Sequence, residues 1–300
     1  MSGPVNHHLL NELERAERSV LAEASLALSP GRTWQAIVRF VAHVIPVVVT
    51  ARLFTGQKLG VRLPDLVAME VSRKGFIEPD ITRMMIESIR PGDVVFDVGA
   101  QFGYHSLLAA LLVGQDGKVV AFEPARRTFS LLQGNIRPFP HIRAEQVAVG
   151  AADGHALLHD FGARKSALNS LFAEARVPLE ERRTLTSSPY EVATTSIDSY
   201  CDRHQLTPRF VKIDAEGSEL SILQGMCQLL TSTHPTVTLE TGDYQGYGHV
   251  STRETIDYLT QLGYDCYEYS DGLRKHQRRA SYGYGNLCFH YVDGLRPMTA

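Results

Sequence analysis

The chain has 300 residues, 44% of them apolar, with 30 Lys and Arg against 33 Asp and Glu. This length and apolar content predict one domain with a sizeable core, with about fifty to eighty residues left over as an extension. A net charge of −3 argues against a protein that relies on bulk attraction to nucleic acid. We therefore expect no nucleic-acid partner.

The cysteines and the hydropathy pattern predict a cytoplasmic protein. The four cysteines are widely spaced and form no C-x-x-C motif, so buried free thiols in a reducing compartment are expected; they are Cys201, Cys227, Cys266 and Cys288. The N-terminus has no charged segment followed by an apolar core, so no secretory signal is predicted. The apolar run 37–54 contains Arg39, Pro46 and Arg52, which argues against a membrane span.

Residues 1–75 are predicted to form an N-terminal extension. Apolar residues recur at spacings of three and four over 8–28, which indicates an amphipathic helix, and a second helix is expected over 33–45. The β-branched run 47–54 and the segment 58–63 flank Thr55-Gly56 and predict a hairpin. We interpret the extension as a cap on the main domain, with a homodimer contact or a substrate lid as alternatives.

Residues 76–300 are predicted to form the main domain, in which strands and helices alternate. Such alternation predicts an α/β fold with a doubly wound, mostly parallel seven-stranded sheet, whose last two strands pair antiparallel at one edge. The seven expected strands are 94–97, 118–123, 142–149, 210–214, 236–240, 265–269 and 286–291. The expected helices are 80–89, 104–112, 127–136, 196–204, 218–230 and 252–262, with two short strands at 156–161 and 191–195.

The segment from Asp97 to Gly103 follows the first of these strands and opens a helix. In such sheets, nucleotide ligands bind where an apolar strand is followed by a glycine turn and the start of a helix. An ordinary connection between a strand and a helix explains the loop equally well. The spacing Gly99-x-x-x-Gly103 lacks the dinucleotide pattern Gly-x-Gly-x-x-Gly. An acid two residues before Gly99 suits a ligand with an ammonium group better than a pyrophosphate.

Four predicted strands end in acids: Asp97, Glu123, Asp214 and Glu240. In an open parallel sheet, these ends line the crevice where ligands bind. Glu123 lies twenty residues after Gly103, where a carboxylate can accept hydrogen bonds from ribose hydroxyls and repel a ribose phosphate. S-adenosylmethionine has a free ribose and a cationic amino acid end, and it meets both demands.

The sequence resembles the FkbM-type, S-adenosylmethionine-dependent methyltransferases. The motifs that carry the resemblance are Phe96-Asp97-Val98-Gly99-Ala100-Gln101-Phe102-Gly103, Ala121-Phe122-Glu123-Pro124 and Val211-Lys212-Ile213-Asp214-Ala215-Glu216-Gly217-Ser218-Glu219. Gly263-Tyr264 and the segment 166–171 also fit, so the resemblance covers roughly 53 to 291. It implies a class I methyltransferase fold with a Rossmann-like sheet, and methylation of hydroxyl groups on small molecules, sugars or natural-product intermediates.

The resemblance also implies the cofactor site. Asp97 to Gly103 would surround the methionine part of S-adenosylmethionine, Glu123 would bind the ribose, and residues 148, 149 and 153 would lie beside the adenine. The expected cofactor contacts are Glu78, Asp97, Gly99, Gln101, Gly103, Tyr104, Glu123, Pro124, Ala148, Asp153 and Asp214. Gln101 departs from the family, which usually has Asn there, and glutamine tolerates a left-handed backbone less well.

The candidate catalytic residues are Asp214, Glu216 and His249. A hydroxyl acceptor must lose a proton, and Asp214 and Glu216 follow a strand beside the cofactor strand. Asp214 is expected to orient the cofactor or the acceptor, and Glu216 either to act as base or, preferably, to cap its own helix. Glu240 and the histidines at 105 and 159 are further candidates. Asp214, Glu216 and Glu240 could hold Mg²⁺, but no spacing demands it, and no metal is expected.

Three other functions compete with methylation of a small molecule. An NAD-dependent oxidoreductase is disfavoured by the glycine spacing, and a nucleic-acid methyltransferase by the absence of an Asn/Asp-Pro-Pro-Tyr/Phe motif after the fourth strand. A non-catalytic module that binds the cofactor is the third. The basic run 274–279 is interpreted as a solvated loop, or alternatively as an edge that attracts an anionic substrate.

Overall fold

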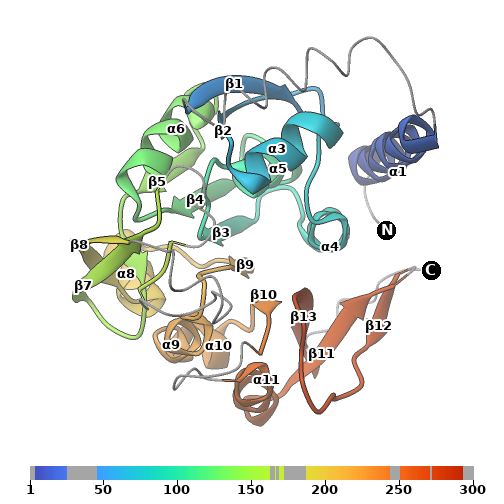
Figure 1. The fold of residues 1–300 in the computed structure, drawn as a ribbon. Helices are drawn as coiled ribbons and strands as arrows, with labels where there is room; N and C mark the ends of the chain where they lie inside the picture. The colour runs from blue at the N-terminus through green and yellow to red at the C-terminus, as the bar shows by residue number, and fades with distance from the viewer. Residues whose placement is uncertain are drawn as a thin grey trace.

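A computed structural model describes residues 4–25, 46–162, 166, 169–171, 187–243, 251–270 and 272–292. At its centre lies a mostly parallel sheet with the strand order β12-β11-β13-β10-β9-β3-β4-β5 (Figure 1). Its strands are β3 (Val94–Val98), β4 (Lys118–Phe122), β5 (Ile142–Glu145), β9 (Phe210–Ile213), β10 (Thr236–Thr241), β11 (Tyr264–Tyr269), β12 (Leu273–Lys275) and β13 (Gly285–Tyr291). The five strands from β10 to β5 run parallel, whereas β13 pairs antiparallel with both β10 and β11.

Helices cover both faces of the sheet, which explains why its central strands are apolar on both sides. Val95 and Phe210 belong to one apolar cluster, whereas their neighbours Phe96 and Val211 belong to the other. The first cluster includes α4 (Pro79–Ser88), α5 (Tyr104–Val113) and α6 (Arg126–Ile136). The second includes α8 (Ile197–His204), α9 (Glu219–Gln224), α10 (Cys227–Ser232) and α11 (Thr252–Gln261).

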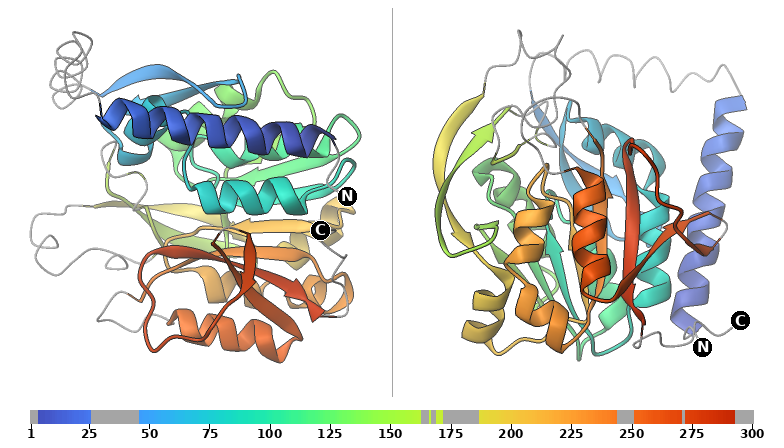
Figure 2. Two further views of the ribbon diagram at one scale, coloured as in Figure 1. Left: turned by 90° about the vertical axis from the view of Figure 1, so that its right-hand side faces the viewer. Right: turned by 90° about the horizontal axis from the view of Figure 1, so that it is seen from below.

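The N-terminal extension packs on the first of these faces. It comprises α1 (Pro4–Ser25), the hairpin β1 (Val47–Arg52) and β2 (Lys58–Leu63), and α3 (Leu66–Lys74). Helix α1 lies beside α4 (Figure 2), where Asn6 donates a hydrogen bond to the carbonyl of Ile86 at 2.6 Å. Because residues of α1, the hairpin and α3 share an apolar cluster with α4 to α6, the extension and the main domain have a continuous core. The domain boundary at residue 75 and the homodimer stay predictions.

A second, smaller sheet lies beside the end of β5. It has the order β6-β8-β7 and consists of β6 (Ala148–Val149), β7 (Gly154–Asp160) and β8 (Ser188–Thr195). The two longer strands were predicted from the sequence, but the prediction of one continuous strand over 142–149 was wrong. The chain leaves the main sheet after Glu145 and enters the small sheet at Ala148.

The predicted fold class is confirmed, and the last two predicted strands, β11 and β13, pair antiparallel at one end of the sheet as expected. Three local corrections apply. The short strand β12 makes the main sheet eight-stranded rather than seven-stranded. The expected helix 218–230 is broken into α9 and α10 around Gly225. Helix α3 was not predicted. The expected helix 33–45 lies outside the described residues.

Two predictions concern the surface and the thiols. In the basic run, Lys275, Arg278 and Arg279 each form an ion pair with an acid of β11 or α11, which supports the interpretation as a solvated loop. Cys201, Cys266 and Cys288 are buried free thiols as expected, but Cys227 is exposed at the start of α10. Among the described residues, no helix combines the length and apolar character that a membrane crossing needs.

The break at Gly225 generates a stability prediction. A Cβ at residue 225 would lie 2.2 Å from the carbonyl oxygen of Gly150, which is too close for any side chain. Gly225→Ala should therefore lower the free energy of unfolding by about 1–3 kcal/mol in urea denaturation. Gly134→Ala is the control, because nothing lies within 4 Å of that position in α6, and it should stabilise by about 0.5–1 kcal/mol. Equal midpoints for the two variants would contradict the packing argument.

Candidate functional site

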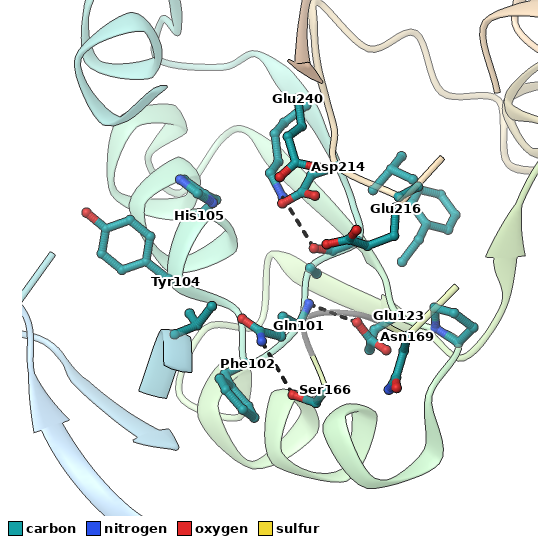
Figure 3. Close-up of a pocket in the computed structure, with 18 of the residues that line it drawn as sticks. Gln101, Phe102, Tyr104, His105, Glu123, Ser166, Asn169, Asp214, Glu216 and Glu240 are labelled. Carbon is teal, nitrogen blue, oxygen red and sulfur yellow. Dashed lines mark hydrogen bonds and ion pairs between the residues drawn. The ribbon is translucent and has the colours of Figure 1, made fainter. Parts of the chain in front are cut away.

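A cavity of about 330 Å³ lies at the carboxyl ends of β3, β4, β9 and β10 (Figure 3). Its walls come from the loops after β3, β4 and β9, from Glu240 near the end of β10, from β6 and α3, and from Tyr284 just before β13. The predicted site residues that line it are Glu78, Gly99, Gln101, Tyr104, Glu123, Pro124, Ala148, Asp214 and Glu216. The topology thus brings together residues from segments that are far apart in the sequence.

The glycine loop at the floor of this cavity depends on Gly99. Its φ is +73°, and a Cβ there would lie 1.7 Å from the carbonyl oxygen of Asp214. Only glycine permits this close approach of the loop to the end of β9. Gln101 has a φ of +50°, so it adopts the left-handed backbone conformation although it is not glycine. This is the position where the family usually has Asn.

Glu123 holds the same loop from the neighbouring strand. Its carboxylate accepts a hydrogen bond from the backbone amide of Gln101 at 3.0 Å (Figure 3) and another from the backbone amide of Ala125 at 2.8 Å. Burial raises the pKa of Glu123 to about 7, although these two amides work in the opposite direction. Each carboxylate oxygen keeps a further lone pair, so the group can still accept hydrogen bonds from a ligand.

The side of the cavity next to Glu123 is apolar. Pro124 follows Glu123, and Ala148 and Val149 of β6 lie with Leu158 of β7 along the same cavity wall. These side chains offer contact area but few hydrogen bonds. Such a surface suits the flat face of an aromatic base, and the contact of residues 148 and 149 with adenine stays a prediction.

A buried lysine organises the centre of the site. The ammonium of Lys212, on β9, lies 3.4 Å from Asp97 and 3.3 Å from Asp214, and it donates to the carbonyl of Gly99 at 3.2 Å. Although burial opposes the charged form, Asp214 and Asp97 raise the pKa of Lys212 above its usual value. The lysine is therefore charged, and its charge is taken up by groups of the protein itself.

Glu78 lies at the N-terminus of α4, with a left-handed backbone (φ +42°). One of its oxygens accepts hydrogen bonds from Tyr284 at 2.9 Å and from Asn286 at 3.3 Å, and the other lies 3.8 Å from Nε2 of His105. Burial, followed by the charge of Asp214, raises the pKa of Glu78 to about 7. Burial also lowers the pKa of His105 well below its usual value, so its imidazole is neutral.

Three carboxylates point toward one another at the far side of the cavity (Figure 3). One oxygen each of Asp214, Glu216 and Glu240 lies within 4.8 Å of the others. Oxygen ligands of this kind suit Mg²⁺, although the lysine beside Asp214 already provides one positive charge there. The expected helix cap at Glu216 was wrong, because the N-cap position of α9 is Ser218, and Glu219 accepts the loop amides of residues 215 and 217.

Several predicted residues lie away from the cavity. Asp97 is fully buried behind it, where it accepts a hydrogen bond from Ser106 at 2.6 Å and pairs with Lys212. Gly103 begins α5 beneath the loop and does not line the cavity. Asp153 points elsewhere and accepts hydrogen bonds from the residues at 195 and 196. His249 lies outside the described residues.

The helix that forms one wall of the site, and the role of the site's central residue, were not predicted from the sequence. Lys212 belongs to a motif of the family, but no function was predicted for it. Leu66, Val67, Glu70 and Val71 of α3 line the cavity, and Asp65 caps that helix by accepting from the amide of Ala68 at 3.1 Å. The signals were present: an Asp N-cap, Arg73 and Lys74 in the last turn, and Gly75 in a left-handed conformation at the end.

The lysine network generates a prediction. Lys212→Met removes the counter-charge of two buried or partly buried carboxylates and should lower the free energy of unfolding by about 3–5 kcal/mol. Lys275→Met, which breaks the solvent-exposed pair with Asp265, is the matched control and should leave the unfolding midpoint unchanged. Chemical denaturation at pH 7.5 measures both. Similar midpoints for the two variants would show that the buried network is not needed for stability.

The strand order, the glycine loop and the acid after β4 define a class I methyltransferase fold. The family model described as "Methyltransferase FkbM domain" matches residues 97–266, more than half of the chain. The chain therefore belongs to the FkbM methyltransferase domain family, as its motifs suggested.

Two curated relatives are similar over about half of the chain. The hexuronic acid methyltransferase AglP of Haloferax volcanii is 27% identical over 159 residues, which cover 52% of this chain and 59% of the relative. The 31-O-demethyl-FK506 methyltransferase FkbM of Streptomyces tacrolimicus is 32% identical over 160 residues, which cover 46% and 61%. This chain thus spans about three-fifths of the length of each relative. Among solved structures, the methyltransferase FkbM from Methylobacillus flagellatus KT gives a TM-score of 0.41 at 18% identity, over 70% of this chain and 50% of the other.

Proposed function

We propose that the protein transfers a methyl group from S-adenosylmethionine to a hydroxyl group of a small molecule, sugar or natural-product intermediate. One observation carries the proposal. The carboxylate of Glu123 lines the cavity beside the loop that Gly99 and Gln101 form, and it holds that loop by a hydrogen bond. A carboxylate in this place can accept the hydroxyls of an unmodified ribose, and the apolar side at Pro124 and Ala148 can receive an adenine.

The cavity also offers an acid for the amino acid end of S-adenosylmethionine. Asp97 was the residue expected to attract the amino acid end, but it is already paired with Lys212 behind the cavity. Glu78 lines the cavity and is the acid better placed to face a cationic end group. When bound, S-adenosylmethionine supplies an activated methyl group. The protein's own residues bind and orient the two reactants and exclude water.

Removal of the acceptor's proton falls to the carboxylates beyond the loop. Asp214 and Glu216 both line the cavity, and the carboxylates of Asp214 and Glu240 lie close to that of Glu216. A base in this position would take the hydroxyl proton as the oxygen attacks. His105 also lines the cavity, but its imidazole is buried against Glu78. We therefore assign the role of general base, which removes the proton of the acceptor hydroxyl, to Asp214 or Glu216.

Cofactor binding should depend on the ionisation of Glu123. The ribose hydroxyls of the cofactor donate hydrogen bonds to the ionised carboxylate of Glu123. Binding therefore favours the deprotonated form of Glu123, and a protonated Glu123 must release its proton when the cofactor binds. Because the pKa of Glu123 is raised to about 7, the ionisation of this group should by itself raise the affinity for S-adenosylhomocysteine about fivefold between pH 6 and pH 7, with little further rise above pH 8.

Calorimetric titrations of S-adenosylhomocysteine from pH 5.5 to 8.5 measure this dependence. Glu123→Gln should bind more weakly and show a shallower pH dependence, because Glu78, whose pKa is also raised to about 7, still titrates. Glu145→Gln, at the end of the next strand, should keep the wild-type dependence. Titration with NADH is the second control and should give no binding. Tight NADH binding without S-adenosylhomocysteine binding would overturn the proposal in favour of an oxidoreductase.

The two candidate bases make a second prediction. Asp214→Asn or Glu216→Gln should lower turnover by about 10²–10⁴-fold with a productive acceptor, and in Glu216→Gln the affinity for S-adenosylhomocysteine should change far less. Turnover is measured as release of S-adenosylhomocysteine in a screen of hydroxylated acceptors. If both variants keep wild-type turnover, the base lies elsewhere. If the wild-type protein binds the cofactor but methylates nothing in the screen, the non-catalytic module is favoured.

A further inference from the structure

Helix α3 places the N-terminal extension at the edge of the cavity. Together with residues of β2 and of the segment after α3, it forms an apolar wall of the cavity. The residues of this apolar wall are Leu59, Leu66, Val67, Val71 and Ile77. Asp65, immediately before α3, is completely buried and does not itself line the cavity. One of its carboxylate oxygens accepts a hydrogen bond from the backbone amide of Ala68 and so caps α3.

The other carboxylate oxygen of Asp65 begins a network of hydrogen bonds that ends at Glu123. The hydroxyl of Ser166 donates to this oxygen at 2.8 Å, and the Ser166 oxygen accepts a hydrogen bond from the side-chain amide of Gln101 at 3.5 Å. The backbone amide of Gln101 donates to Glu123 at 3.0 Å. Figure 3 shows the last two of these bonds. We call Asp65, Ser166, Gln101 and Glu123 the Ser166 network, which joins four segments that are far apart in the sequence.

The hydrogen-bond donors and acceptors of the Ser166 network fit together in one arrangement. An ionised carboxylate only accepts hydrogen bonds, so Ser166 donates its single hydroxyl hydrogen to Asp65. The Ser166 oxygen then presents lone pairs to Gln101, and the NH₂ group of that side chain is the matching donor. Burial raises the pKa of Asp65, whereas hydrogen bonds from the hydroxyl and the backbone amide of Ser166 lower it. Ser166 thus stabilises the ionised carboxylate and at the same time holds the Gln101 side chain.

The side chain of Gln101 reaches Ser166 although its backbone conformation is unfavourable. Its φ of +50° lies in the left-handed region, which costs free energy for a residue other than glycine and which asparagine adopts more readily than most residues. Asparagine, however, is one methylene shorter than glutamine. Because Gln101 reaches Ser166 only at 3.5 Å, an asparagine in its place would fall short. Backbone preference and the contact with Ser166 therefore make opposite demands on this residue.

We propose that Asp65 and Ser166 are positioning residues for cofactor binding. They hold the Gln101 side chain and, through it, keep the glycine loop and its hydrogen bond to Glu123 in the conformation that receives S-adenosylmethionine. The inference rests on the proposed methyltransferase function and deepens it. The region matched by the family model begins at residue 97, so cofactor affinity would depend on an acid of the N-terminal extension that lies outside that region.

The substitution Gln101→Asn separates the two demands. If backbone preference alone mattered, this variant would bind S-adenosylhomocysteine as well as the wild type or better. The proposal predicts the opposite, a fall in affinity of about three- to tenfold, which is the size expected for one lost hydrogen bond. Calorimetric titration at pH 8, where Glu123 with its pKa of about 7 is largely ionised, measures the change. Unchanged or higher affinity overturns the proposal.

A double-mutant cycle tests whether Gln101 and Ser166 act through each other. Ser166→Ala should also weaken S-adenosylhomocysteine binding about three- to tenfold, since it removes the acceptor of the same hydrogen bond. Because both substitutions break one interaction, the double variant should bind about as weakly as the weaker single variant. Factors that multiply instead would show that the two residues act independently, and this result also overturns the proposal.

Asp65→Asn tests the far end of the network, at a residue that does not line the cavity. The carbonyl oxygen of asparagine can still accept from Ala68 and cap α3, but an NH₂ group then faces the Ser166 hydroxyl. Affinity for S-adenosylhomocysteine should fall about three- to tenfold. The matched control is Asp198→Asn, because Asp198 accepts from the amides of residues 228 and 229 at the start of α10 and does not line the cavity. It changes the charge equally and should leave the affinity unchanged.

Wild-type affinity in Asp65→Asn, or an equal loss of affinity in Asp198→Asn, overturns the proposal. Thermal unfolding of the ligand-free variants checks that each one is folded. If Asp65→Asn does not fold, the variants at 101 and 166 decide the question, because they leave the cap of α3 intact. Failure of the wild-type protein to bind S-adenosylhomocysteine would instead overturn the proposed function, so the two failures can be told apart.

Discussion

The site depends on the buried ammonium of Lys212. Asp97 and Lys212 are register partners on the neighbouring parallel strands β3 and β9, so the sheet itself brings the two charges together. The same ammonium reaches Asp214 at the end of its own strand and the carbonyl of Gly99 in the loop after β3. One cation thus fixes two strand ends and the loop between them. An uncompensated acid in this place would be costly, because buried charges need a partner.

Two carboxyl groups near this lysine, those of Glu78 and Glu123, lie in surroundings that disfavour their charged forms. Glu78 and Glu123 both have pKa values raised to about 7, because burial disfavours their charged forms. Each accepts two hydrogen bonds from the protein, and these do not fully compensate. A ligand with hydroxyl or ammonium groups can donate hydrogen bonds to these carboxylates and so lower the free-energy cost of burying their charge. That gain contributes to the free energy of binding.

Much of the fold could be predicted from the sequence, because the strands are buried on both faces and read as short apolar runs between clear turns. The contacts of the site were harder to predict. From its position in the sequence, Asp97 looks like an acid that binds the ligand. In the structure it pairs instead with Lys212 on β9, and this neighbour depends on the strand order, which one sequence does not reveal. At the break, Gly225 lies so close to Gly150, seventy-five residues away, that a Cβ would not fit, and one sequence does not reveal this contact. Helix α3 was missed although Asp65 and Gly75 marked its ends.

The position of α3 has a consequence for how such enzymes diverge. The region matched by the family model begins at Asp97, so it contains the glycine loop, Glu123 and Lys212, whereas the apolar wall comes from residues 59–77. If α3 contacts the acceptor, one wall of the acceptor site lies before the region that the family model matches, while Asp214 and Glu216 lie within that region. Exchange of α3 would then alter this wall and leave those carboxylates in place. One domain could in this way come to serve acceptors as different as those for which its two relatives are named, a hexuronic acid and 31-O-demethyl-FK506.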